Sequence, residues 1–243
     1  MKKITRLLFV LCLLISTFSY FRQEKLPPKE EVLNDLNQEP QQIRVEIPAF
    51  TTTVGEIDYT ITPRFEYELY GLVVSYHHSA RWWDYYHDKW QDFINLKDIC
   101  VVWGENSQNE VYQEMKFSSG SWTCHYQWPS RAVGSQFNKE QLSNNHLLAD
   151  DPQISQEILK SRRGDQVYFK GYLANYSHST GFNRSSSTTR KDNGCEVIYV
   201  TDFKILKRGN QTWRLIHLSS KYLLAALLVV GLASFLIPPR KTS

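Results

Sequence analysis

The chain has 243 residues, 42% of them hydrophobic and 22% charged, which suffices for one sizeable core and excludes a disordered protein. Five of its 28 basic residues lie in the two acid-free ends, 1–21 and 222–243, so the middle carries 23 basic against 25 acidic side chains. Because nonspecific nucleic-acid binding depends on a basic excess that neutralises phosphates, this balance argues against a nucleic-acid partner.

The N-terminal stretch is typical of a membrane-targeting segment. Three basic side chains in the first six residues precede the apolar run 7–18. A basic start before an apolar core of this length indicates a signal peptide or a short signal anchor, so we assign residues 1–21 to one of these. Residues 22–42 are polar and contain prolines, which predicts a polar tether.

A second apolar run, residues 222–237, contains no charge and is followed by a basic tail, 239–243. Its only polar residue is Ser234, whereas a helix on the surface of a soluble core would have a polar face. We therefore predict a transmembrane helix over residues 219–238, although the run is shorter than the about 20 residues that usually cross a bilayer.

Charge at the two ends predicts the topology. Basic residues hold flanking segments in the cytoplasm, so both tails are expected there. The β-rich domain, residues 43–218, is then expected on the periplasmic or extracellular side of the cytoplasmic membrane. A further basic cluster, residues 204–221, precedes the second run and argues against this placement.

The middle of the chain alternates apolar and polar residues in several short segments. Residues 43–50 and 56–62 predict an N-terminal β hairpin. A helix is indicated after Asp151, a capping residue followed by Pro152 at the first helical position. Five further strands are predicted, three before this helix and two after it: 67–76, 98–104, 121–128, 166–176 and 195–206.

This order of strands and helix resembles the OB-fold, a five-stranded barrel with a helix between its third and fourth strands. The phrase Arg163–Gly171 (RGDQVYFKG) looks like the start of the fourth OB strand. The chain is also similar to uncharacterised bacterial membrane-anchored proteins with SNNHLLADD-like and RGDQ-like phrases. The resemblance covers about residues 66–206 and implies a mainly β, OB-like barrel flanked by two terminal apolar helices. A different small β-barrel or an α+β sandwich would leave a similar pattern.

The OB resemblance also implies a binding face, because OB domains bind across their second and third strands, between the one–two and four–five loops. In this chain those loops are residues 77–97 and 177–194. The expected ligand-binding residues are Trp103, Trp122, Trp128, Arg184 and Arg190. The alternative is that these aromatics belong to the core and the second loop is a polar surface loop.

The stretch 77–93 is rich in histidine, aspartate and aromatic residues. Its candidate metal ligands are His77, His87 and Asp88, with His78 and Asp84 as further possibilities. Their spacing matches no established metal pattern, and neighbouring side chains on a strand point apart. We therefore expect no metal and no cofactor, and interpret the stretch as a solvated loop with an aromatic anchor.

Two further patterns suggest chemistry. His146 with Asp150 or Asp151 could act as a base with its orienting partner, but a turn and helix cap explains the same residues. Neighbouring Cys124 and His125 point apart on a strand, so they form no nucleophile–base pair. Since the third and fifth strands of an OB barrel are neighbours, the resemblance implies a Cys124–Cys195 disulfide.

The sequence thus predicts a membrane-anchored, non-enzymatic binding or scaffold protein. Its expected partners are the lipid bilayer and another envelope protein or a glycan, with no nucleic acid; the oligomeric state stays open. One alternative is an intracellular OB-type protein that binds single-stranded nucleic acid at the membrane. The other is a metal-dependent hydrolase that uses the His/Asp-rich loop.

Overall fold

A computed structural model describes residues 2–79, 84–189 and 194–236. Contacts along the chain divide it into two units. The globular unit comprises Leu26–Arg208, and the helical unit comprises the described residues before and after that range.

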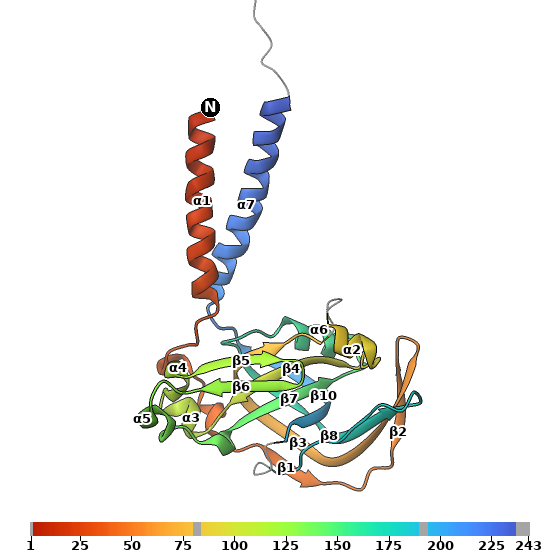
Figure 1. Cartoon of the computed structure of the whole chain (residues 1–243). Helices are drawn as coiled ribbons and strands as arrows, with labels where there is room; N and C mark the ends of the chain where they lie inside the picture. Colours follow the sequence, from red (N-terminus) through yellow and green to blue (C-terminus); the bar gives the residue numbers. More distant parts are fainter. Residues whose placement is uncertain (1, 80–83, 190–193, 237–243) are drawn as a thin grey trace, which may run out of the picture. The chain divides into compact units, whose positions relative to one another are not determined.

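The helical unit consists of two long helices, α1 (Lys2–Gln23) and α7 (Gln211–Leu236) (Figure 1). Each is long and apolar enough to cross a membrane, over Lys3–Gln23 and Gln211–Ala233, which by length and composition is weak support for a membrane association. The second helix contains the residues of the predicted span as far as 236 and extends it toward the N-terminus. The helix begins eight residues before the predicted start, which gives the short apolar run the length that a span requires.

The two helices of this unit pack against each other. The rings of Phe18 in α1 and Trp213 in α7 meet edge to face at 5.4 Å. In addition, His217 Nδ1 lies 3.0 Å from the carbonyl oxygen of Ser16. Side-chain packing and a polar contact of this kind are what join helices in an apolar medium, where the hydrophobic effect contributes little.

The globular unit is mixed α/β rather than mainly β. Eight strands form one mixed sheet: β1 (Gln41–Arg44), β2 (Phe50–Val54), β3 (Ile57–His77), β4 (Asn95–Val102), β7 (Leu142–Leu148), β8 (Gln166–His178), β9 (Asn183–Arg184) and β10 (Glu196–Lys207). A separate hairpin consists of β5 (Lys116–Gly120) and β6 (Thr123–Gln127). The short helices are η1 (Lys29–Glu31), η2 (Asn34–Asn37), α2 (Tyr85–Lys89), α3 (Glu105–Gln108), α4 (Val111–Glu114), α5 (Arg131–Gly134), η3 (Lys139–Gln141) and α6 (Pro152–Lys160).

Five of these strands form a closed ring of hydrogen-bonded pairs. Around the ring, β3 pairs with β4, β4 with β7, β7 with β10, β10 with β8, and β8 again with β3. The β7–β10 pair is parallel, and the other four are antiparallel. Helix α6 connects β7 to β8, the third and fourth ring strands along the chain.

The strand predicted at 121–128 is present as β6, but it is not the third ring strand, because it belongs to the separate β5–β6 hairpin. Its place in the ring is taken by β7, for which we had predicted a turn and a cap. β7 pairs on both edges and is buried almost throughout, so it lacks the apolar–polar alternation of a half-exposed strand. The cap prediction holds for Asp151 alone, which accepts from the backbone N–H groups of Gln153 and Ile154 at 2.7 and 3.0 Å.

The N-terminal part of the globular unit also differs from expectation. A hairpin is present as β2 and β3, but β2 begins at residue 50, where the predicted strand 43–50 ends. β3 starts near the predicted second strand and continues without a break through the next predicted strand to His77. The predicted tether, residues 22–42, is not extended polar chain. It forms η1, η2 and the start of β1, and Leu36 is completely buried against the domain.

The main core draws apolar residues from all five ring strands and from α6, among them Val73, Ile99, Leu147, Phe169 and Ile198. Alternation along β4 places Ile99 and Val101 in this core, while the intervening residue, Cys100, faces a second cluster under the β5–β6 hairpin. The two sides of β4 therefore hold two different layers together.

The disulfide joins Cys100 to Cys124, whose Cα atoms are 5.8 Å apart, and the predicted Cys124–Cys195 pair was wrong. The prediction failed because Cys124 lies on the hairpin strand β6, not on a ring strand beside β10. Cys195 is a free cysteine.

Candidate functional site

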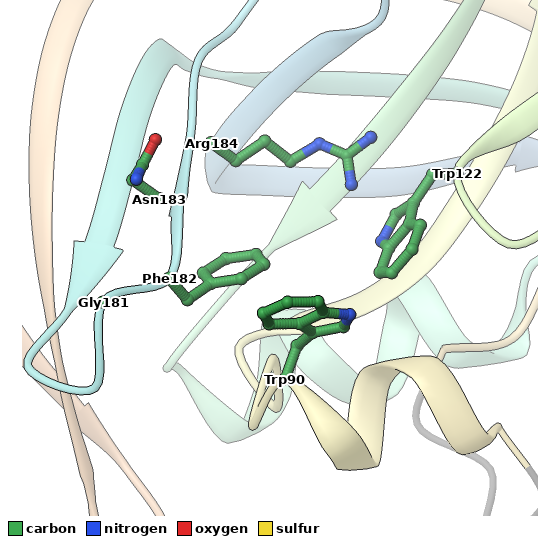
Figure 2. A pocket seen from close by; sticks show the side chains of 6 residues that line it. All are labelled: Trp90, Trp122, Gly181, Phe182, Asn183 and Arg184. Carbon is green, nitrogen blue, oxygen red and sulfur yellow. The ribbon is translucent and has the colours of Figure 1, made fainter.

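A cavity of about 500 Å³ opens on the globular unit (Figure 2). Six residues line it: Trp90, Trp122, Gly181, Phe182, Asn183 and Arg184. Three separate segments supply them, namely the loop after α2, the β5–β6 turn and the loop into β9. The walls are mainly aromatic, and a single guanidinium provides the charge.

The aromatic walls surround the cavity from two sides. The rings of Trp90 and Phe182 lie 6.4 Å apart, and Figure 2 shows Trp122 across the cavity from Phe182. The guanidinium carbon of Arg184 lies 5.3 Å from the centre of the Trp122 ring, within the range of a cation–π interaction. Flat apolar walls with one convergent charged group are typical of a small-molecule binding site.

The backbone of Trp122 is held in an unusual conformation. Its φ of 61° lies in the left-handed region, which is uncommon for residues other than glycine and costs of the order of 1–3 kcal/mol. The structure offsets this cost with a buried hydrogen bond, because the Trp122 N–H donates to Asp98 Oδ2 at 2.8 Å. Asp98 thereby fixes one wall of the cavity.

Arg184 is positioned through the same carboxylate. His146, on the neighbouring strand β7, is completely buried, and its Nδ1 lies 2.6 Å from Asp98 Oδ1. The opposite ring nitrogen, Nε2, lies 2.9 Å from a terminal nitrogen of Arg184. A guanidinium only donates, so this contact requires a free lone pair on Nε2. A chain of contacts thus runs from Asp98 through His146 to the charged group of the cavity.

The charges of Asp98 and His146 stabilise each other, whereas the charge of Arg184 opposes that of His146. Burial alone raises the pKa of Asp98, but the positive potential of His146 and the hydrogen bonds from His146 and Asn95 outweigh it and lower the pKa. Burial lowers the pKa of His146, but the Asp98 carboxylate outweighs it and raises the pKa, against the opposing charge of Arg184. The contact with Arg184 therefore belongs to the neutral imidazole, and the protonated imidazole that Asp98 favours would lose it, because Nε2 would then carry a proton.

The free thiol of Cys195 lies beside the same cluster. It contacts the Trp122 carbonyl oxygen and Asn144 Nδ2, each at 3.5 Å. Burial raises the pKa of this thiol, but His146 and Asn144 outweigh burial and lower it. Cys195 is therefore a polar neighbour of the cavity wall, a position that its place in the sequence did not suggest.

The structure brings together two of the predicted ligand-binding residues, Trp122 and Arg184. The third, Trp103, does not line the cavity. It is completely buried in the main core, and its Nε1–H donates to Glu39 Oε2 at 3.1 Å. Trp128 is 41% exposed but packs against Tyr126, and it does not line this cavity. Arg190 lies outside the described residues.

The His/Asp-rich loop forms a separate cluster. The side chains of His77, Asp84 and His87 converge, whereas Asp88 is exposed on α2 and takes no part. His146 is paired with Asp98 and not with Asp150 or Asp151. Sequence reasoning missed Asp98, because a charged residue inside an apolar strand gives no sign of which distant residue it will meet.

Trp90 and Phe182 were also missed as individual residues, although both lie in the two loops that the OB resemblance had singled out. No protein-family model matches the chain, and neither a curated protein nor a solved structure is significantly similar to it.

Proposed function

We propose that the protein is a membrane-anchored binding protein whose cavity takes an acidic, ring-shaped ligand, with an acidic glycan of the cell envelope as the first candidate. The observation that carries this proposal is the convergence of three aromatic side chains and Arg184 from separate segments. Aromatic faces stack on flat apolar surfaces, including the faces of sugar rings, and a guanidinium pairs with a carboxylate through two parallel hydrogen bonds. The contact with His146 occupies only part of the guanidinium's five N–H donors.

We further propose that the five-strand ring is OB-like. Numbered along the chain, its strands are neighbours in the order 1-2-3-5-4-1, and the helix lies between the third and fourth. The loops that join strands one to two and four to five supply Trp90 and residues 181–184 to the cavity. These are the loops that flank the ligand in OB domains, which supports a ligand at this position.

The proposed location is the cytoplasmic membrane, with the globular unit on its periplasmic or extracellular side and a short basic tail in the cytoplasm. Packing of α1 against α7 supports a first segment that stays in the protein as an anchor. The Cys100–Cys124 disulfide supports an oxidising compartment. The proposed partners are therefore the bilayer and an envelope component, and not a nucleic acid.

Calorimetry with the full chain in detergent micelles tests the proposal. It compares the binding of an oligogalacturonate with that of an uncharged galactan of equal length. We expect the acidic sugar alone to bind. Arg184→Gln should weaken binding roughly tenfold or more, the value of a hydrogen bond to a charged group. Trp122→Leu should weaken it too.

Two matched variants serve as controls. Arg131→Gln changes an exposed arginine on α5, and Trp128→Leu changes an exposed tryptophan that does not line the cavity; both should bind as the unchanged protein does. Equal affinity for the charged and uncharged sugars would contradict the proposal, as would normal binding by Arg184→Gln. Salt-sensitive binding of single-stranded DNA instead would favour the nucleic-acid alternative.

A further inference from the structure

Three ligand atoms converge in the segment between β3 and β4. One ligand atom each from His77, Asp84 and His87 lies within 4.8 Å of the other two. Both imidazoles approach the same carboxylate oxygen, since His77 Nε2 is hydrogen-bonded to Asp84 Oδ2 and His87 Nδ1 lies 3.0 Å from it. The two imidazole rings are stacked, with their centres 6.1 Å apart.

The local fold explains the convergence. His77 is the last residue of β3, and Asp84 is the N-cap of α2, where its Oδ1 accepts from the His87 N–H at 3.2 Å. His87 follows three residues after the cap and so lies over the same face of the first helical turn. The sequence hides this geometry, because the strand end and the helix start meet only after the chain has turned.

We propose that His77, Asp84 and His87 bind a divalent transition-metal cation, with Zn²⁺ as the first candidate. Two imidazole nitrogens and one carboxylate oxygen form a donor set that zinc sites use, whereas Ca²⁺ and Mg²⁺ prefer oxygen ligands alone. Metal–ligand distances of about 2.0–2.2 Å in a tetrahedral site place ligand atoms roughly 3.4 Å apart. The 3.0 Å separation of His87 Nδ1 and Asp84 Oδ2 lies near that value, and all three ligand atoms lie within 4.8 Å of one another, so small side-chain shifts would complete the site.

The buried carboxylate of Asp92 lies where it could orient His87 for metal binding. Asp92 is completely buried, and its Oδ2 has no hydrogen-bond partner among the residues that the structure describes. This oxygen lies 3.7 Å from His87 Nε2. A metal at Nδ1 would leave the imidazole proton on Nε2, where Asp92 is the nearby acceptor. Carboxylates commonly orient metal-bound histidines in this way.

The hydrogen bond between Asn95 and His87 places the imidazole proton of His87 on the other nitrogen from the one that metal binding requires. Asn95 Nδ2 lies 3.1 Å from His87 Nε2, so this nitrogen accepts and the proton stays on Nδ1, facing Asp84. Binding a cation would move that proton to Nε2 and leave Asn95 with its other acceptor, Asp98 Oδ1, at 3.1 Å. The proposal therefore requires a change of tautomer, and replacing Asp92 should impair it.

The cluster has an open side. The side chain of His77 is 23% exposed, whereas those of Asp84 and His87 are 2% exposed. Three protein ligands would leave a fourth position for water or another molecule. The cluster does not depend on the glycan proposal, although His87 packs on Trp122 with ring centres 4.9 Å apart.

The proposal is tested by measuring zinc binding to the untagged full chain in detergent micelles. The protein is first treated with a chelator. Equilibrium dialysis with Zn²⁺ alone should give one ion per chain, and Co²⁺ should produce the absorption bands of a tetrahedral site. Asp84→Asn and His87→Gln should each weaken binding by more than about 100-fold, and Asp92→Asn by about 10–100-fold, the usual cost of losing an outer-shell partner.

Matched controls separate the site from general effects. Asp88→Asn changes an exposed acid on the same helix, and His125→Gln changes an exposed histidine on β6; both should bind Zn²⁺ normally. Asn also caps helices, so Asp84→Asn should keep its fold and its disulfide. The proposal is overturned by an absence of stoichiometric Zn²⁺, by unchanged binding in Asp84→Asn and His87→Gln, or by equally tight binding of Ca²⁺.

Discussion

At the scale of single residues, Asp98 determines most of the cavity's geometry. Its two carboxylate oxygens accept from the Trp122 N–H and from Asn95 Nδ2, and it pairs with His146, which in turn contacts Arg184. Removing one member of a buried charged pair leaves its partner uncompensated, which usually costs more than the pair itself contributes. The same carboxylate should therefore govern both stability and binding.

Asp98→Asn should lower the free energy of unfolding at neutral pH by about 3–5 kcal/mol, because it leaves buried His146 without its anion. Urea unfolding of the full chain in detergent, followed by tryptophan fluorescence, measures the effect. Asp88→Asn, at an exposed position, should leave the free energy unchanged. A loss no larger than that of Asp88→Asn would contradict this role.

The difference in the free energy of unfolding between the unchanged protein and Asp98→Asn should depend on pH, because the pKa of Asp98 is lowered in the folded state. A carboxyl group whose pKa is lower in the folded state contributes stability above its unfolded pKa of about 4. That contribution disappears as the pH falls through the folded pKa. The gap between the unchanged protein and Asp98→Asn should thus shrink below about pH 4. It should also shrink at high pH, because Asp98 raises the pKa of His146 to about 9 and that contribution is lost as the pH rises through this value.

At the scale of elements, the β5–β6 hairpin depends on a covalent link. It is a two-stranded sheet of its own, and isolated hairpins are marginally stable in water. The Cys100–Cys124 disulfide fastens it to β4, and Phe117 and Tyr126 pack into the cluster beneath it. Since Trp122 lies in the hairpin turn, the disulfide also helps to hold the cavity wall.

Replacing both Cys100 and Cys124 by alanine should lower the free energy of unfolding by about 3.5 kcal/mol, the loop-closure value for a separation of 24 residues. Urea unfolding measures this change, and Cys12→Ala, in α1, is the control. Mass mapping without reduction should find Cys100 joined to Cys124. A peptide that links Cys195 to either of them would contradict the structure.

At the scale of the whole molecule, the two terminal helices and the domain form separate units. If both helices cross the membrane, the two chain ends lie on one side and the entire domain on the other. The basic ends favour a cytoplasmic position for the tails, while the basic residues between 204 and 221 oppose it.

Protease treatment of bacterial cells that express the chain distinguishes these topologies. We expect residues 26–208 to be digested in spheroplasts without lysis, while a cytoplasmic marker protein stays intact. Protection of the domain until the membrane is lysed would place it in the cytoplasm and refute the proposed orientation. In that case, nucleic-acid binding would become the first activity to test.

Part of the fold could be predicted because it is encoded locally. The apolar runs at the two ends, the Asp151–Pro152 helix start and the alternating strands depend on neighbouring residues alone. The structure has both apolar helices, the helix start and most of these strands, but residues 45–49 of the predicted strand 43–50 form none. β7 could not be predicted this way. Its polar residues meet partners from distant parts of the chain inside the ring: His146 pairs with Asp98, and Asn145 Nδ2 donates to the carbonyl oxygen of Ile99.

The sequence by itself thus determined the two apolar helices and most of the strands, and the OB resemblance singled out two loops that supply Trp90 and residues 181–184 to the cavity. Only the tertiary structure decided that Trp122 and Arg184 share a cavity, that Trp103 does not, and that Cys100 pairs with Cys124. The physical reason is the range of the interactions. Hydropathy and capping act over a few neighbouring residues, whereas a buried charge or a disulfide selects partners that lie far apart in the chain.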